Sequence, residues 1–247
     1  EAEFVSGTVT LTNEHTPETI SLTVTKQWDD QNNNDGTRPY AVEIELLQNG
    51  VKYRSVKLAG TATNLPLSHT WNDLPRYANG TIITYTVVET GYYTDSNAAT
   101  PIHAIPDGYY VDHFYSTQNP ELFDSNLTHP HALVVNKYTP KVVSLNIQKQ
   151  WIDDNNRDGL RPEGLTFQIW KTTDATAAGK IPSVENGWTP LTTATMTKGA
   201  DGQWWDITVN DLPKYENQQL VYYSATEIGH TDKTDAGTVE TATVPEG

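Results

Sequence analysis

The chain has 247 residues, no cysteine, and a formal net charge of −15 from 31 acidic and 16 basic side chains. This acidic balance argues against nucleic acid and anionic membranes as partners, because both attract basic surfaces. The lack of cysteine excludes disulfides, thiolate metal sites and cysteine nucleophiles. No apolar run is long enough to cross a bilayer, so we expect no membrane partner.

Strand-like patterns of β-branched, aromatic and alternating residues recur along the chain, and helical periodicity is almost absent. In chain order, the predicted strands cover residues 21–28, 41–48, 81–89, 131–138, 144–151, 165–170, 204–209 and 220–227. Clusters of Gly, Pro, Asn and Asp between them predict turns at 32–36, 48–50, 74–80, 105–108 and 155–159. Short strands with frequent turns are typical of antiparallel β-sandwiches.

The sequence repeats internally. "VTKQWDDQNNNDGTRP" at 24–39 returns as "IQKQWIDDNNRDGLRP" at 147–162. "VTLTNEHTPETISL" at 9–22 returns as "LVVNKYTPKVVSL" at 133–145, and both matches run at an offset of 123 residues. A repeat of this length, in a chain of this size, indicates two tandem domains.

Later landmarks of the repeat are separated by 138 residues. "NDLPRY" at 72–77 matches "NDLPKY" at 210–215, and Glu89 matches Glu227. The second unit therefore carries about fifteen extra residues, which we place in a surface loop at 172–188. The first unit carries its own long insert at 95–131.

These landmarks give a domain plan in three parts. Residues 20–140 form the first domain, and residues 141–247 form a second domain that lacks its own closing strand. Residues 1–19 combine an opening "EAEF", typical of the remnant of a yeast secretion vector, with an orphan segment that resembles a closing strand. The chain is thus out of phase with its own repeat unit.

The ordered motifs "VTKQWDD…DGTRP", "NDLPRY", "YTVVETGYY" and "LVVNKYTP" resemble the signature segments of Cna protein B-type (CnaB) domains, which are stalk modules of Gram-positive surface adhesins and pilins. The resemblance covers both units. It implies two tandem immunoglobulin-like, reverse-immunoglobulin or transthyretin-like β-sandwiches in an elongated array. It also implies a spontaneous isopeptide bond between a lysine of the first strand and an asparagine of the last, promoted by a glutamate.

Carried over by motif, the resemblance implies a Lys26–Asn136 bond promoted by Glu89 in the first domain. The residue types suit this chemistry. Burial lowers the pKa of a lysine amine and raises the pKa of a carboxyl, so that a neutral amine and a neutral Glu89 can coexist. Glu89 can then polarise the amide carbonyl and carry the proton to the departing ammonia. No cofactor is needed, and the bond forms once per domain, so the chain is expected to be no enzyme.

The second domain supplies Lys149 and Glu227 but no asparagine of its own. The orphan segment at the start of the chain contains Asn13, the repeat equivalent of Asn136. We therefore expect another copy of the protein to donate this strand into the second domain, with a trans Lys149–Asn13 isopeptide bond. The alternative is a chain cut at an arbitrary boundary.

Other motifs have simpler interpretations. Asp154, Asn156 and Asp158 match half of an EF-hand loop, but Leu165 occupies the position of the bidentate glutamate, so an Asx-rich turn is expected and no metal site. Histidines in the first insert are expected to be loop residues without a metal; they are His103, His113, His129 and His131. The tyrosines and phenylalanine of this region either cover one end of the sandwich or form a ligand platform.

The function expected from these observations is structural: a self-cross-linked repeat of a cell-wall adhesin or pilin, outside a Gram-positive cell. The alternative is a ligand-binding module that uses the insert at 95–131 to hold a host matrix protein or a carbohydrate. Neither interpretation involves a nucleic acid.

Overall fold

The computed structural model describes residues 7–8, 10–61, 65–123, 129–198, 204–234 and 237–241, the last seven strand residues of β16 and β17 by their backbone alone. Two compact units divide the chain. The first comprises Glu1–Asp29 and Arg38–Lys137, and the second comprises Asp30–Thr37 and Tyr138–Gly247. The short segment 30–37 thus belongs to the second unit, although the strands on both sides of it belong to the first. The "EAEF" segment lies outside the described residues.

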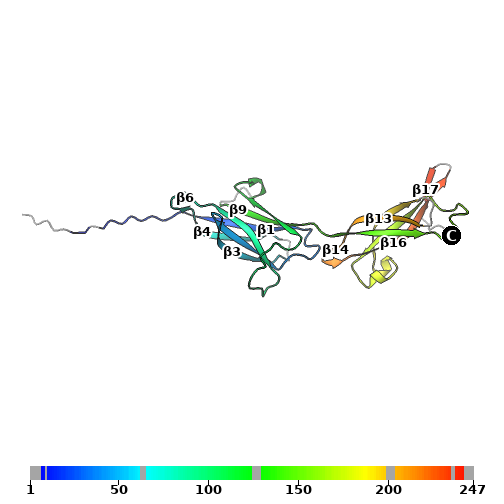
Figure 1. Ribbon diagram of the computed structural model, residues 1–247, viewed down its shortest axis with the longest axis horizontal. Coiled ribbons are helices and arrows are strands. Elements are labelled where there is room, and N and C mark those ends of the chain that lie inside the picture. The colour runs from blue at the N-terminus through cyan, green and yellow to red at the C-terminus, as the bar shows by residue number, and fades with distance from the viewer. Residues whose placement is uncertain are drawn as a thin grey trace, which may run out of the picture. The chain divides into compact units, whose positions relative to one another are not determined.

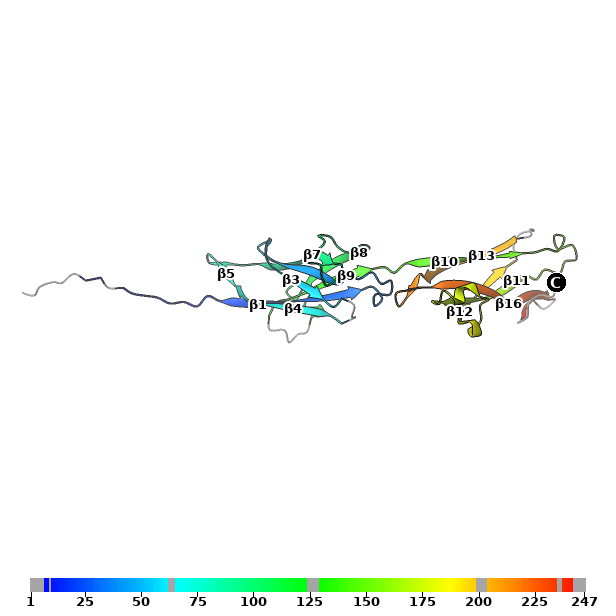
Figure 2. The same cartoon turned by 90° about the horizontal axis from the view of Figure 1, so that it is seen from below.

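The described residues are nearly all β-structure (Figures 1 and 2), which confirms the predicted all-β fold class. Helical structure in them is confined to three short 3-10 turns, η1 (Pro120–Leu122), η2 (Ala177–Gly179) and η3 (Val184–Asn186). None of the described helices is long and apolar enough to cross a membrane.

The first unit is a sandwich of two sheets. Its strands are β1 (Thr19–Asp29), β2 (Ala41–Gln48), β3 (Val51–Ala59), β4 (Leu67–Pro75), β5 (Tyr77–Ala78), β6 (Thr81–Ile82), β7 (Tyr85–Tyr93), β8 (Tyr109–Tyr115) and β9 (His131–Tyr138). One sheet has the order β4-β1-β9-β8, the other has the order β3-β2-β7, and β5 and β6 form a small hairpin. The first strand and the last pair side by side and parallel, with Trp28 opposite Asn136.

Alternation along the strands explains the core of this unit. Leu22, Val24 and Lys26 follow one another at every second position of β1 and are all buried. Leu22 and Val24 pack with Ile44 of the facing sheet and Val134 of β9 in a single apolar cluster. Lys26 is buried at the next inward position of β1. One face of each sheet is therefore dry, and a lysine sits on it.

The second unit repeats this plan in part. Its strands are β10 (Val142–Gln150), β11 (Gly164–Thr172), β12 (Thr189–Thr197), β13 (Trp204–Pro213), β14 (Tyr215–Glu216), β15 (Gln219–Leu220), β16 (Tyr222–Thr234) and β17 (Gly237–Thr241). The sheet β12-β11-β16-β17 faces a two-stranded sheet, β10-β13, and β14 and β15 form a hairpin.

The sheets that contain the opening strands differ between the units. In the first unit β1 lies between β4 and β9, whereas β10 pairs with β13 on one edge and has no second strand partner among the described residues. Within that part of the chain, no strand of the second unit takes the place of β9.

The structure corrects the sequence reading of the first insert. The sequence predicts no strand between residues 95 and 130, but β8 lies there and forms the edge of the four-stranded sheet. Its pattern alternates: Tyr109 is buried, and Val111 and Tyr115 pack against the core. Polar residues at 112 and 113 mask this period in the sequence. The strands β3, β4, β12 and β17 were not predicted either, because their many polar residues hide the alternation.

Candidate cross-link site

Lys26 lies on the inner face of β1 with no exposed surface. Its Nζ donates a hydrogen bond to the Gln27 carbonyl at 2.6 Å and lies 4.0 Å from the centre of the Trp28 ring. An aromatic face attracts a cation, but a fully buried ammonium group loses its hydration. The lysine is therefore held within the core beside aromatic and carboxyl groups.

Glu89 and Asn136 meet at this lysine from different strands. Glu89 belongs to β7 of the facing sheet, where it is 4% exposed, and Asn136 belongs to β9 and is fully buried. Asn136 Nδ2 donates to Glu89 Oε1 at 2.7 Å, and Lys26 Nζ lies 3.9 Å from Glu89 Oε2. Three residues from a stretch of more than a hundred positions are thus brought together, as the motif resemblance implies.

Two buried oxygens of this group have no hydrogen-bond partner among the described residues: Glu89 Oε2 and Asn136 Oδ1. Burial raises the pKa of Glu89, while the charge of Lys26 and the hydrogen bond from Asn136 oppose the rise. A protonated Glu89 needs an acceptor, and the unpaired amide oxygen of Asn136 is one. Rotation of the amide about its last bond places that oxygen against the carboxyl group.

His113 and Tyr109, both from β8, complete the surroundings of the site. The backbone N–H of Glu89 donates to His113 Nε2 at 3.4 Å, and burial lowers the pKa of His113, which favours the neutral ring. Tyr109 packs edge-on against Trp28 with ring centres 5.1 Å apart. The sequence analysis expects His113 to be a loop residue, and the structure places it in β8 instead. The period-two pattern of residues 109–115 is the signal that would have placed it beside Glu89.

The second unit holds a partial copy of the site. Lys149 Nζ pairs with Glu227 Oε2 at 2.9 Å and lies 4.8 Å from the Trp151 ring. The two side chains are 26% and 12% exposed, whereas those of Lys26 and Glu89 are fully buried. Glu227 Oε1 is buried without a hydrogen bond among the described residues. The Lys149–Glu227 ion pair is thus formed, but the described residues place no asparagine side chain beside it as Asn136 lies beside Glu89.

Strand register is the same at both sites. Lys26 lies opposite Leu67 and Lys149 opposite Trp205, which are equivalent positions of β4 and β13. Glu89 lies opposite Ile44, and Glu227 lies opposite Phe167. A bulge precedes the glutamate contact in each unit, between residues 43 and 44 and between residues 166 and 167. Each glutamate is therefore directed at its lysine by the same backbone irregularity.

Asn13 lies apart from both sites. It is exposed, and residues 10–18 form no strand. Leu11, the repeat equivalent of the fully buried Val134, is 89% exposed. A large apolar side chain in an extended segment is thus open to a partner, and the proposed pairing of Asn13 with Lys149 stays a prediction.

The weaker sequence motifs have structural partners of their own. Asp153 forms an ion pair with Arg161 at 2.5 Å, and its Oδ1 accepts a hydrogen bond from the Asn156 N–H at 3.1 Å. His129 and His131 hydrogen-bond to Thr23 and Thr25 of β1. Among the described residues, no group of three or more His, Cys, Asp or Glu side chains is placed to hold a metal ion.

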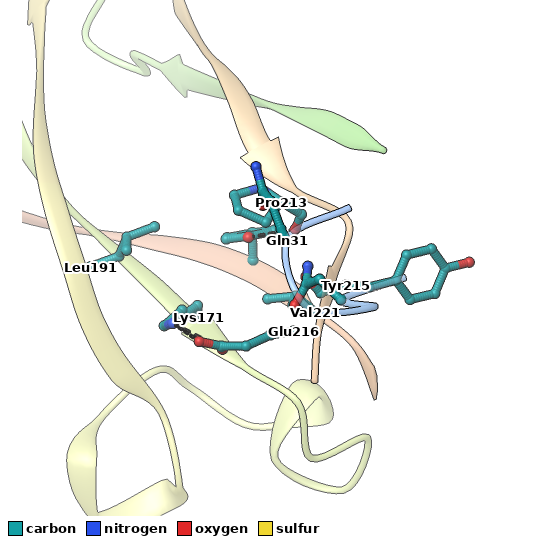
Figure 3. Close-up of a pocket in the computed structure, with 9 residues that line it drawn as sticks. Gln31, Lys171, Leu191, Pro213, Tyr215, Glu216 and Val221 are labelled. Carbon is teal, nitrogen blue, oxygen red and sulfur yellow. Dashed lines mark hydrogen bonds and ion pairs between the residues drawn. The ribbon is translucent and has the colours of Figure 1, made fainter. Parts of the chain in front are cut away.

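A pocket of about 200 Å³ opens in the second unit. Its lining includes Leu191, Tyr215 and Gln31. Lys171 and Glu216, joined by a dashed line in Figure 3, form an ion pair of 2.7 Å there. Both charged groups already satisfy each other, so the pocket offers few free polar groups to a ligand.

The fold and the buried Lys–Glu–Asn group define a class of protein: immunoglobulin-like β-sandwich repeats whose first and last strands lie side by side. The family model for the Cna protein B-type domain matches residues 22–109 and 145–244. The chain belongs to this family.

Two relatives support the assignment. The chain is 32% identical over 234 residues to a collagen adhesin of Staphylococcus aureus. This match covers 94% of this chain and 16% of that protein. A crystal structure of two B repeat units (B1B2) of the collagen-binding protein of Staphylococcus aureus matches with a TM-score of 0.59 and 28% identity. That match covers 92% of this chain and 50% of the other.

Family membership confirms the resemblance drawn from the motifs and the predicted sandwich fold. It also supports the prediction that the chain is no enzyme, because the family consists of structural adhesin domains. The chain spans about a sixth of the length of its curated relative, so properties of that whole protein do not transfer directly.

Proposed function

We propose that this chain is a load-bearing repeat segment of a Gram-positive surface adhesin, covalently closed in its first unit by a Lys26–Asn136 isopeptide bond. The observation that supports this most strongly is the meeting of Lys26, Glu89 and Asn136 in a dry core, at 3.9 Å and 2.7 Å. A structural ion pair would not require a buried amide with an unpaired oxygen. Family membership supports the extracellular location.

The reaction balances without a cofactor. The neutral amine of Lys26 attacks Cγ of Asn136, a C–N bond forms, and the bond from Cγ to Nδ2 breaks. Protonated Glu89 first donates a hydrogen bond to the amide oxygen, then takes a proton from the lysine nitrogen and gives one to the departing ammonia. Holding both groups in the core replaces a bimolecular encounter, an advantage of about 10⁵ M or more in effective concentration.

The position of the bond explains its mechanical use. A load that enters at Thr19 and leaves at Tyr138 passes along β1 to Lys26, crosses to Asn136 and leaves along β9. The segment 27–135 lies off this path. Closing a ring of about 110 residues also removes unfolded-state entropy worth roughly 4–5 kcal/mol, by analogy with a disulfide.

Intact mass spectrometry tests the first unit. We expect the purified chain to be lighter than its sequence by one ammonia for the Lys26–Asn136 bond. Glu89→Ala should restore the full mass, and Glu227→Ala, which removes the equivalent acid of the second unit, should not. A wild-type chain of full mass would refute the bond.

We further propose that the second unit receives a strand from another copy. Lys149 and Glu227 are in place, and the outer edge of β10 has no strand partner in the described structure. With the register of β1 and β9, Leu11 of the donor would lie opposite Lys149, and Asn13 opposite Trp151. Leu11 would then fill the position that Val134 fills in the first unit, and the product would be a trans Lys149–Asn13 bond.

A peptide spanning residues 7–20 tests this proposal on the chain that carries Asn13→Ala. We expect an adduct whose mass is the sum of chain and peptide less one ammonia. The same peptide with Asn13→Ala should leave no adduct under denaturing conditions, while a Thr12→Ala peptide should still react. Wild-type chains should form a ladder on a denaturing gel, and a single monomer band would contradict strand donation.

Ligand binding through the first insert is the alternative. The collagen adhesin suggests a host ligand by its name, and Tyr110 is 57% exposed on β8. Tyr109 is buried, and Tyr115 packs against the core and hydrogen-bonds to the Val87 backbone. Because β8 is part of the sheet, Tyr110→Ala is a better test than deletion of the insert: loss of binding to collagen or glycan arrays would favour this function.

A further inference from the structure

One loop of the first repeat belongs to the second compact unit, and its contacts there are specific. We call residues 30–36 the first Asx loop and β14–β15 (Tyr215–Leu220) the second hairpin. Asn34 Nδ2 donates to the Tyr215 carbonyl at 2.6 Å. Asn34 accepts from the backbone N–H of Asn217 at 3.0 Å and from that of Gln218 at 2.8 Å. The loop therefore binds the hairpin backbone.

The same loop also holds the chain just ahead of β10. Asp35 Oδ2 accepts from the Tyr138 hydroxyl at 3.0 Å and from the Lys141 N–H at 2.9 Å. Gly36 packs so closely that an added Cβ would lie 3.2 Å from Cβ of Gln218, and its φ of +68° suits glycine. Loop and hairpin fit each other without space for a side chain.

Both partners of this contact recur elsewhere in the chain. Residues 153–159 form a second Asx loop with the same backbone: φ is positive at 31, 32, 33 and 36 in the first loop and at 154, 155, 156 and 159 in the second. The opening aspartate accepts a hydrogen bond from the asparagine three residues on in both. β5–β6 (Tyr77–Ile82) is the equivalent first hairpin.

The second Asx loop and the first hairpin, however, are both exposed in this structure. An added Cβ would meet nothing within 4 Å at Gly159 or at Gly80, the equivalents of Gly36 and Gln218. Ile152 and Leu160, at the two sides of the second Asx loop, are 90% and 81% exposed. On the first hairpin, Tyr77 is 42% and Ile82 63% exposed. Apolar surface is thus present on both free faces.

We propose that the second Asx loop is a docking site for the first hairpin of a second copy of this chain. Asp158, the equivalent of Asp35, would accept from the Glu18 backbone N–H and from the His15 ring of that copy. Ile152 and Leu160 would cover its Tyr77 and Ile82.

Charge distinguishes this contact from the one already formed. Arg157 replaces Asn34, and the facing segment carries Glu14 and Glu18 where the inner repeat carries Lys137 and Lys141. Arg157 pairs within its loop with Asp154 at 3.2 Å and with Asp158 at 3.7 Å. These pairs are exposed and therefore weak, so Arg157 can exchange them for Glu14 and Glu18 of the second copy, which favours copies joined head to tail. This contact uses side chains and hairpin backbone, and it does not depend on strand donation to β10.

Engineered cysteines give a direct test, because the native chain has none. One copy carries Asp154→Cys and the other Ala78→Cys with a size tag, at the equivalents of Gln31 and Glu216, which line one pocket in the contact already formed. Both copies carry Asn13→Ala so that no trans isopeptide bond can form. Under mild oxidation we expect the mixed, reducible dimer to form at least about tenfold faster than with Glu185→Cys, an exposed site away from the loop, in place of Asp154→Cys.

Adding Asp158→Ala to the Asp154→Cys copy should slow the mixed dimer about tenfold, the effect of losing hydrogen bonds to a charged acceptor. Adding Glu185→Ala, which removes the same charge elsewhere, should leave the rate unchanged. Equal rates for Asp154→Cys and Glu185→Cys, or for Asp158→Ala and Glu185→Ala, would overturn the docking site. Reduction separates this dimer from an isopeptide ladder, so the outcome is independent of the strand-donation test.

Discussion

Each unit contains an equivalent lysine–glutamate pair, but the pair is more deeply buried in the first unit than in the second. In the first, β9 and β8 extend the sheet beside β1, and the side chains of Lys26 and Glu89 are fully buried. In the second, β10 has only β13 beside it, and the side chains of Lys149 and Glu227 are partly exposed.

The difference shows that placing the lysine against the glutamate does not by itself shield the pair from water. Two strands and a bulge suffice to place a lysine against a glutamate, since both units do so in the same register. Removal of water requires the closing strand, which also carries the amide. Because a neutral amine and a neutral acid are favoured only in a dry site, we infer that the strand that brings the substrate also creates the conditions for the reaction.

Replacement of the two lysines should give the largest contrast. Lys26→Met keeps the shape of the side chain but prevents the bond, so the first unit should lose roughly 4–5 kcal/mol of stability. Lys149→Met in the isolated chain should change the second unit by less than about 1 kcal/mol, the usual scale of a partly exposed ion pair. Denaturant unfolding, with the two transitions assigned by tryptophan fluorescence, measures both. Equal losses would show that the first unit is not closed.

A matched pair of leucines should give the next largest effect. Leu22 is 3% exposed in β1, and its equivalent in β10, Leu145, is only partly buried. Leu22→Ala should cost roughly 3 kcal/mol, and Leu145→Ala about 1 kcal/mol. If strand donation is correct, the cost at Leu145 should increase after the 7–20 peptide has bound. A cost that does not change with peptide would argue against a strand at that edge.

A smaller effect concerns pH. In a chain with Lys26→Met, burial raises the pKa of Glu89 above that of the unfolded chain. The folded state then holds its proton more tightly, so the stability from this group is complete at low pH and is lost as pH rises through the folded pKa. We expect the free energy of unfolding to fall from about pH 4.5 upward.

The control is the double variant Lys26→Met with Glu89→Gln, which has no acid to titrate at the site. Other groups, His113 among them, are common to both chains and cancel in the difference between the two pH profiles. Parallel profiles would mean that Glu89 is not buried in its acidic form.

The sequence predicted the site better than the sheets. The resemblance to CnaB domains implied that Lys26, Glu89 and Asn136 lie together, and the structure brings the three side chains together. The period-two apolar residues of the strands indicated which side chains share the core. Strands such as β3 and β12 were not predicted, because their exposed faces and many Lys and Thr residues weaken the alternation of apolar and polar residues.

Two features could not be predicted from one chain's pattern. His113 lies beside Glu89 only because β8 joins the sheet through β9, a long-range pairing that local residues do not specify. The grouping of the first Asx loop with the second unit also depends on contacts between residues 34 and 217, about 180 positions apart. Periodicity reports which face is buried, and it carries no information on which distant segment covers it.

The smallest expected effect concerns Tyr138, which contacts the first Asx loop, and His15, its equivalent in the repeat. Tyr138→Phe removes the hydroxyl that donates to Asp35, and it should destabilise the second unit by roughly 1 kcal/mol, the usual net value of such a hydrogen bond. His15→Ala changes the equivalent residue ahead of β1, which is exposed in the isolated chain, so the monomer should unfold as the wild type does. The same His15→Ala change, placed in the Ala78→Cys copy, should slow mixed-dimer formation, because docking would give His15 the acceptor that Tyr138 already has. If His15→Ala instead destabilises the monomer and leaves dimer formation unchanged, the two segments are not equivalent.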